Sequence, residues 1–282
     1  MRLAGSAVLA LLSLLPAPAG ARETMPKDFV YLREVAPAIA QEMRYATSDN
    51  FTARPLPGYR AGECVLRRDA ALALGKVAQD LAAQKLGLKV YDCYRPQRAV
   101  RAFWRWSQDR KSGGDQRFYP NVAKSALFGL GYIASHSRHS AGTAVDLTLV
   151  ALSATVRSRA SGNPASQIQT LPVAPGSPLA RGRTENQASA APCTAPASER
   201  APDTSPANSL DNSLDMGTGF DCLDVKSYTH SRAVTAEQRH RRDLLKAAMS
   251  ARGFRNYFRE WWHYEYGAPR GYYDFPILPR PQ

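Results

Sequence analysis

Apolar and polar residues alternate with two different periods in the first half of the chain. Residues 69–86 carry apolar side chains three and four positions apart, which predicts an amphipathic helix with Gly87 as its C-terminal cap. Residues 88–91 alternate at every second position and predict a half-buried strand. Residues 97–110, which include three large aromatic side chains, predict a second helix. This half is therefore expected to form a helix, a strand and a helix in succession.

The second half repeats both patterns. Residues 143–150 alternate and are rich in strand formers, which predicts another strand. Thr235, followed three residues later by Gln238, has the form of a capping box and predicts a helix that Gly253 ends. Residues 257–266 are dense in aromatic side chains and predict a final strand.

Between these halves the composition changes abruptly. In residues 151–210, 38 of 60 positions are Ala, Ser, Thr, Pro or Gly, and none is aromatic. Such a segment buries too little apolar surface to offset the entropy lost on ordering, so we predict that most of it is disordered. It is either an insertion within one domain or a linker between two domains, and the positions of the functional motifs decide which.

The first 21 residues have the three parts of a secretory signal peptide. Arg2 is positively charged, residues 3–15 are apolar, and residues 19–21 form an Ala-Gly-Ala cleavage site. The apolar run is shorter than the about 20 residues that a membrane-spanning helix needs; an N-terminal anchor or a buried helix is the alternative. We therefore expect cleavage after Ala21 and a periplasmic or secreted protein, with no other segment crossing a membrane.

Export implies an oxidising compartment, so the four cysteines are interpreted first as disulfides. No Cys-x-x-Cys occurs, which argues against a structural zinc site or a thioredoxin-like redox pair. Three pairings are open, and four buried thiols are the alternative. We favour Cys93 with Cys222 and Cys64 with Cys193.

Length and charge say less about function. At 282 residues the chain is long enough for one or two domains, and its net charge of +13 is compatible with an anionic envelope or with nucleic acid. The basic residues are scattered, apart from residues 239–242 on a predicted helix, whereas a nucleic-acid site needs them clustered with aromatics. We expect no nucleic-acid partner.

Two stretches carry the side chains that a hydrolytic zinc ion prefers. His139 and Asp146 lie seven residues apart, on an expected loop and on the strand that follows. Residues 260–263, Glu-Trp-Trp-His, add a second imidazole and a second carboxylate. A catalytic zinc needs three protein ligands and an open position, which predicts His139, Asp146 and His263. Glu260 is then left as the base that takes the proton of the attacking water.

Each stretch also has a plainer interpretation: a surface histidine with a capping aspartate, or an aromatic core strand with an ion-paired glutamate. Residues three apart on a regular strand face opposite sides. A bulge or a strand end must therefore bring Glu260 and His263 together. The two tryptophans between them are expected to wall the site and keep it dry.

Arg95 is a third candidate. Pro96 disfavours helical backbone at Arg95, which predicts a strand end or a turn. An arginine fixed there can stabilise the oxyanion that forms when water attacks a peptide carbonyl. Taken alone, Arg95 is better interpreted as a surface arginine, and only its combination with the zinc set favours the functional role.

At these motifs the sequence resembles a known family. Ser-x-His-x-x-Gly-x-Ala-x-Asp at 137–146, followed by Glu-x-x-His at 260–263, is similar to the signature of LAS-type zinc peptidases. Tyr-Asp-x-Tyr-Arg-Pro at 91–96, Asp-Met-Gly-Thr-x-Phe-Asp at 215–221 and Glu-Trp-Trp-His-Tyr at 260–264 narrow it to D-alanyl-D-alanine dipeptidases of the VanX type. The resemblance covers residues 26–150 and 209–278.

The resemblance implies a single α+β domain, in which helices flank a central, mostly antiparallel sheet. It also implies one Zn²⁺ per chain and a small D,D-dipeptide as substrate, with D-Ala-D-Ala cleaved to two D-alanines in peptidoglycan turnover or D-alanine recycling. The positions that match the family's functional residues are His139, Asp146 and His263 as zinc ligands, Glu260 as base, Arg95 as stabiliser of the tetrahedral intermediate, and Ser137 and Asp221 beside the dipeptide, with Asp221 partnering its ammonium.

The ligands lie on both sides of residues 151–210, so this segment is an insert within one catalytic domain of residues 22–282. A Cys93–Cys222 bridge would staple the substrate pocket. Three other functions stay open: a D,D-carboxypeptidase acting on longer peptidoglycan stems, a non-catalytic zinc-containing module that binds cell wall, and a basic binder of nucleic acid or of an anionic envelope polymer. We expect no stable membrane insertion, and the sequence does not specify an oligomeric state.

Overall fold

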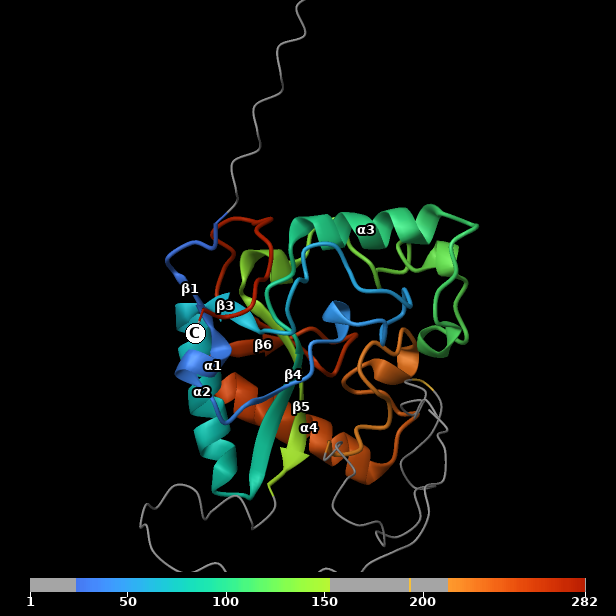
Figure 1. Cartoon of the computed structure of the whole chain (residues 1–282). Helices are drawn as coiled ribbons and strands as arrows, with labels where there is room; N and C mark the ends of the chain where they lie inside the picture. Colours follow the sequence, from blue (N-terminus) through green and yellow to red (C-terminus); the bar gives the residue numbers. More distant parts are fainter. Residues whose placement is uncertain (1–23, 153–192, 194–212, 282) are drawn as a thin grey trace, which may run out of the picture.

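A computed structural model describes residues 24–152, 193 and 213–281 of the protein. It combines helices with two sheets, as Figure 1 shows, which confirms the predicted α+β fold class. The helices are α1 (Leu32–Val35), α2 (Arg68–Ala82), α3 (Gln97–Gln108) and α4 (Ala236–Ala251). The strands are β1 (Phe29–Tyr31), β2 (Ala40–Gln41), β3 (Val65–Arg67), β4 (Leu86–Asp92), β5 (Ala144–Ala151), β6 (Phe254–Asn256) and β7 (His263–Tyr266).

The main sheet has five strands in the order β2-β4-β5-β7-β6. β2 is parallel to β4, and the β4–β5, β5–β7 and β6–β7 pairs are antiparallel. β1 and β3 form a separate antiparallel pair. The central sheet is therefore mostly antiparallel, as predicted. β5, which precedes the predicted insert, pairs directly with β7, which follows it.

The helices occupy two regions around this sheet. α2 and α4 pack against each other and against the sheet, whereas α3 crosses the top of Figure 1, away from them. α2 buries the predicted apolar stripe of Leu74, Val77 and Leu81. α4 begins with the predicted capping box, in which the Thr235 hydroxyl accepts from Gln238 N (3.2 Å) and Gln238 Oε1 accepts from Thr235 N (2.9 Å).

The turn between α2 and β4 corrects one predicted boundary. α2 ends at Ala82 rather than at residue 86, and Lys85 adopts left-handed backbone with φ of 59°. Gly87 is not a helix cap but lies in β4, where a Cβ atom would come within 2.9 Å of Leu152 Cδ2. A close tertiary contact, rather than helix termination, is what favours glycine at this position.

All four cysteines form disulfides, but not in the favoured pairing. The bridges join Cys64 to Cys93 and Cys193 to Cys222, with Cα–Cα distances of 5.3 and 5.0 Å. The expected Cys93–Cys222 and Cys64–Cys193 pairs are therefore wrong. Cys64 precedes β3 and Cys93 follows β4, and Tyr94 N donates to the first residue of β3 (2.8 Å). This proximity results from tertiary packing, which cysteine spacing does not encode.

The predicted signal peptide and most of the predicted insert lie outside the described residues. The insert was expected to begin at residue 151, but Ala151 is still the last residue of β5. Across the described part of the chain, no helix combines the length and the apolar character needed to cross a membrane.

Candidate active site

The register of three neighbouring strands places three polar residues in one row. Asp146 on β5 pairs with Asp92 at the end of β4 and with His263 at the start of β7. Residues directly opposite each other project from the same face of a sheet. β4 reaches this register through a bulge, because Tyr91 is an extra residue between two successive pairs with β5. The bulge therefore turns Asp92 onto the face that carries Asp146.

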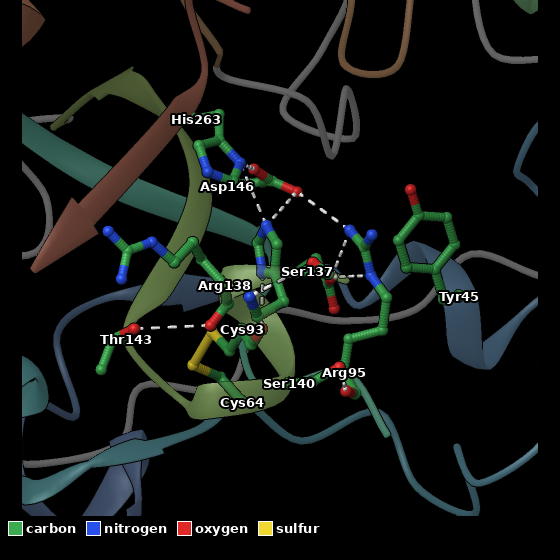
Figure 2. Close-up of polar contacts among 12 residues, drawn as sticks. Tyr45, Cys64, Cys93, Arg95, Ser137, Arg138, Ser140, Thr143, Asp146 and His263 are labelled. Carbon is green, nitrogen blue, oxygen red and sulfur yellow. Dashed lines mark hydrogen bonds and ion pairs between the residues drawn. A yellow bond between two sulfur atoms is a disulfide. The ribbon is translucent and has the colours of Figure 1, made fainter. Parts of the chain in front are cut away.

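The three predicted metal ligands meet on this face, and Figure 2 labels Asp146 and His263 among them. The candidate ligand atoms of His139, Asp146 and His263 all lie within 4.8 Å of one another. His263 Nδ1 lies 3.0 Å from Asp146 Oδ1 and 3.1 Å from His139 Nε2. His139 Nε2 lies 3.3 Å from Asp146 Oδ2. Two imidazoles and one carboxylate are a donor set that suits a divalent ion such as zinc, with a further position left for water or substrate.

The charges of this cluster support a cation site. Burial disfavours the charged form of Asp146, but contacts with His139 and His263 hold its pKa below the ordinary value. Burial also lowers the pKa of His263, yet the hydrogen bond to Asp146 and the nearby carboxylate of Glu265 raise it to about 10. The ionised Asp146 therefore favours positive charge at the point where the three side chains meet.

His139 is held in the orientation that a metal ligand needs. It lies in a 3₁₀ turn, η4 (Arg138–Ala141), in which Ser137 Oγ accepts from His139 N (3.3 Å). Gly142 ends the turn with φ of 68°, and a Cβ atom there would lie 2.2 Å from the Phe29 ring. His139 Nδ1 lies 2.7 Å from the carbonyl oxygen of Cys93. Nδ1–H therefore donates to that carbonyl, and the lone pair of Nε2 faces the cluster.

A tight turn, rather than the strand predicted for residues 257–266, brings Glu260 to His263. β7 begins only at His263, whose N donates to Glu260 O at 3.2 Å, the hydrogen bond of a β-turn. Asn256 Nδ2 donates to both the Glu260 and His263 carbonyls, at 3.0 Å each. Glu260 Oε2 lies 3.7 Å from His263 Nδ1. The required strand end is present, and it aims the carboxylate at the ligand cluster.

The surroundings of Glu260 suit proton transfer. Its side chain is 16 % exposed and that of His263 is 12 % exposed, so both are largely screened from bulk water. Desolvation raises the pKa of Glu260 to about 7, with Asp146 adding to the shift and His263 and Arg95 opposing it. A carboxyl group with this pKa can both accept and return a proton near neutral pH.

Arg95 lies beyond the end of β4, as predicted, and a second carboxylate fixes it. Arg95 Nε and Nη2 lie 2.9 and 2.8 Å from Asp92 Oδ2. Asp92 also accepts from the Tyr59 hydroxyl at 2.6 Å, and the guanidinium lies over the Tyr45 ring, 4.9 Å from its centroid. Burial would lower the pKa of Arg95, but Asp92 and neighbouring groups keep it well above the ordinary value. Arg95 therefore stays charged, with Nη2 only 3.6 Å from Asp146 Oδ2.

The two predicted substrate contacts, Ser137 and Asp221, line the same cavity. Asp221 is buried, accepts from the Tyr45 hydroxyl at 2.8 Å and adopts left-handed backbone with φ of 60°. Burial and the charge of Asp146 raise its pKa well above the ordinary value. A cationic group entering the cavity would therefore stabilise Asp221 in its ionised form.

The cavity has a volume of about 270 Å³. The two tryptophans expected to wall it do not line it, because Trp261 and Trp262 are buried in the core and Trp261 Nε1 donates to Thr218 Oγ1 (2.8 Å). That expectation is wrong. Other aromatic rings line the cavity instead: Tyr45, Phe51, Phe103, Tyr132 and Tyr257.

Four further residues, which were not predicted from the sequence, hold the site together: Asp92, Tyr45, Tyr59 and Glu265. Glu265 Oε1 lies 3.7 Å from His263 Nε2, and Glu265 Oε2 lies 3.2 Å from Arg138 Nε. Two of the four are marked in the sequence. Strand alternation places Glu265 on the same face as His263, and Asp92 stands within the 91–96 motif. Tyr45 lies in a short 3₁₀ turn (Arg44–Ala46) and Tyr59 in a loop, and no sequence pattern marks either residue.

Fold and site together give an α+β protein in which three side chains that could hold a metal ion, a buried carboxyl group with a raised pKa and a fixed arginine surround one small cavity. Hydrolases that activate water use this combination of groups. The comparison with known families gives the assignment directly. The chain belongs to the D-ala-D-ala dipeptidase family, whose sequence profile matches residues 25–156 and 179–278. It is accordingly a peptidase.

Individual relatives agree with this assignment. A D-alanyl-D-alanine dipeptidase of Streptomyces coelicolor is 32 % identical over 257 residues, which span 90 % of this chain and all of that protein. A D-alanyl-D-alanine dipeptidase of Enterococcus faecium is 28 % identical over 257 residues, which again span 90 % of this chain and all of that protein. One from Escherichia coli is 26 % identical over 238 residues, or 84 % of each chain.

Proposed function

We propose that the protein is a zinc-dependent dipeptidase that hydrolyses free D-Ala-D-Ala to two D-alanines, with one zinc ion per chain. The observation that carries this proposal is the meeting of three ligand side chains within 4.8 Å in a cavity where Glu260 lies 3.7 Å from His263. The names of the relatives supply the substrate class.

The roles of the residues follow from their positions. Zinc, held by His139, Asp146 and His263, supplies Lewis acidity toward the amide carbonyl and lowers the pKa of water. Glu260 takes the proton of the attacking water and delivers it to the amine of the departing D-alanine. Arg95 donates to the carbonyl oxygen as negative charge develops there.

Recognition of a free dipeptide follows from Asp221. The raised pKa of its buried carboxyl group favours the neutral form, and a substrate ammonium group would favour the ionised form and pair with it. An acylated stem peptide has no ammonium group and would not form this ion pair. This favours a dipeptidase over a D,D-carboxypeptidase. Ser137, whose Oγ already accepts from His139 N, keeps its hydroxyl proton to donate to a substrate oxygen.

We further propose that the protein acts outside the cytoplasm, in peptidoglycan turnover or D-alanine recycling. The signal-like pattern of residues 1–21 supports this location. The two disulfides also support it, because such bridges persist in oxidising compartments.

A substrate panel assayed with and without a zinc chelator tests the proposed function. We expect turnover of D-Ala-D-Ala that stops on chelation and returns when zinc is added. N-acetyl-D-Ala-D-Ala and an acylated tripeptide ending in D-Ala-D-Ala should be hydrolysed slowly or not at all. Rapid cleavage of the tripeptide would favour the carboxypeptidase, equal rates on L-Ala-L-Ala would remove the stereospecific assignment, and zinc binding without turnover would indicate a binding module.

A substitution at Asp221 tests how the substrate ammonium is bound. We expect Asp221→Asn to lower kcat/KM for D-Ala-D-Ala by about 100-fold, mainly through KM, because a buried charge pair loses one partner. Asparagine tolerates left-handed backbone, so this variant removes the charge without imposing backbone strain at φ of 60°.

Steady-state kinetics with D-Ala-D-Ala and its N-acetyl analogue provide the measurement. The loss should be confined to the free dipeptide. Tyr45→Phe is the matched control, because it removes the 2.8 Å hydrogen bond to Asp221 and keeps both the ring and the carboxylate. It should cost far less than Asp221→Asn. An unchanged KM in Asp221→Asn would assign the ammonium to another group.

A further inference from the structure

The segment that follows β4 and the turn that carries His139 are interlocked by three hydrogen bonds. His139 Nδ1 donates to Cys93 O (2.7 Å), and Arg95 N donates to His139 O (3.2 Å). Ser140 Oγ donates to Arg95 O (2.7 Å). The oxyanion arginine and a metal ligand are therefore positioned by the same short stretch of backbone, residues 93–95.

This stretch lies outside regular structure. β4 ends at Asp92, just after its bulge, and α3 begins only at Gln97. The Cys93 carbonyl is thus not held by a strand ladder. A ligand-orienting carbonyl must stay fixed, because the position of the hydrogen-bond partner sets the tautomer and the ring orientation of the histidine.

The Cys64–Cys93 bridge adds a covalent constraint (Figure 2) beside the hydrogen bond that Tyr94 N donates to Val65 O (2.8 Å). Cys64 is itself fixed on both sides, because its N donates to Gln41 Oε1 (2.9 Å) and its carbonyl accepts from Leu32 N (2.9 Å). Both cysteines are fully buried. The disulfide therefore ties residue 93 to α1, β2 and β3, which belong to the part of the fold that precedes α2.

We propose that the Cys64–Cys93 disulfide is a positioning element for the metal site: it fixes the Cys93 carbonyl that orients His139, and breaking it weakens zinc binding. The proposal rests on the proposed zinc function. Because Arg95 is two residues further along the same stretch, catalysis suffers as well, but the primary effect is on metal affinity.

The second disulfide offers a matched control. Cys222 directly follows Asp221, and its partner Cys193 contacts Phe118 O through Sγ (3.3 Å). In the described structure neither cysteine has a hydrogen bond to His139, Asp146 or His263. Losing this bridge removes one covalent link, as losing the first does, but leaves the Cys93 carbonyl in place.

The test compares two double variants, Cys64→Ala/Cys93→Ala and Cys193→Ala/Cys222→Ala. Alanine is chosen because it leaves no unpaired polar group in the buried positions of the first pair. Zinc dissociation constants are measured by competition with a chromophoric chelator, and circular dichroism checks folding. We expect zinc binding about 10–100-fold weaker in Cys64→Ala/Cys93→Ala, the range typical of lost outer-shell partners, and wild-type affinity in the other variant.

Turnover at increasing free zinc separates positioning from general loss of structure. If the bridge acts through metal affinity, added zinc restores much of the activity of Cys64→Ala/Cys93→Ala. Equal zinc affinity in this variant and the wild type would overturn the proposal, and so would equal weakening in both double variants. A wild-type protein that binds no zinc would instead refute the proposed function.

A second measurement keeps the test decisive if Cys64→Ala/Cys93→Ala does not fold. In Cys193→Ala/Cys222→Ala the remaining bridge is Cys64–Cys93, so a phosphine reductant acts on that bridge alone. Zinc release to excess chelator is followed during reduction, and the freed thiols are counted by mass after alkylation. Release should accelerate as thiols appear, and a release rate that stays constant through full reduction would contradict the proposal.

Discussion

Glu260→Gln is expected to lower kcat for D-Ala-D-Ala by about 10³-fold, within the range that general acid–base catalysis contributes. Glutamine keeps the shape of the side chain but cannot take the proton of the attacking water or return it to the leaving amine. The β-turn that holds residue 260 depends on backbone atoms and on Asn256, so the substitution should leave the fold intact. Zinc content and KM should change little.

The pH profile gives this prediction a second measurement. In the wild type, kcat/KM should rise with pH as Glu260 loses its proton. The surrounding protein raises the pKa of Glu260 to about 7, and a bound cation lowers it again, so the rise should be centred at or below pH 7. This acidic limb should vanish in Glu260→Gln. Full activity in the zinc-loaded variant would show that another group is the base.

Glu265→Gln provides the matched comparison for Glu260→Gln. Glu265 is also a carboxylate beside His263, but it faces Nε2 at 3.7 Å, on the other side of the ring from Glu260. At saturating zinc, its replacement should cost far less in kcat. Equal losses in both variants would mean that the charge around His263, rather than proton transfer by Glu260, controls the rate.

His263→Ala is expected to abolish D-Ala-D-Ala hydrolysis by removing one of three metal ligands. The loss of zinc affinity should exceed the about 10–100-fold that outer-shell partners contribute, because a ligand itself is gone. Asp146 would also lose the nitrogen that lies 3.0 Å away and would remain buried with less compensation. Metal analysis after dialysis and competition titration measure the effect independently of turnover.

His136→Ala is the control for zinc binding. His136 is three residues before His139 and lines the same cavity, but it is not part of the ligand group. Its removal should leave the zinc content of the dialysed protein unchanged. Wild-type zinc content in His263→Ala would show that the metal is held by a different set of side chains.

Local patterns in the sequence were sufficient for much of this structure. Three features depend on side chains that lie close to one another in the chain, so spacing alone predicts them. They are the apolar stripe of α2, the capping box of α4 and the alternating pattern of β5. Spacing alone also predicts that Glu260 and His263 act together, because they lie only three residues apart.

The predictions from local sequence are wrong where tertiary packing imposes a different requirement on the residue. Gly87 follows a helical pattern, which predicts a helix cap. It lies instead in β4, where the close approach of Leu152 favours a residue without a Cβ atom. Trp261 and Trp262 lie between Glu260 and His263 in the sequence, yet both are buried in the core. Neighbours in sequence do not share an environment when a tight turn separates them.

By itself, the sequence determined which side chains could hold a metal and move a proton, because His139, Asp146, Glu260 and His263 stand in short motifs. Tertiary structure alone decided how they meet. The bulge at Tyr91 turns Asp92 onto the face of Asp146, strand register aligns Asp146 with His263, and the Cys64–Cys93 bridge fixes the carbonyl that orients His139. These are contacts between segments distant in the chain, which depend on packing and register rather than on local spacing.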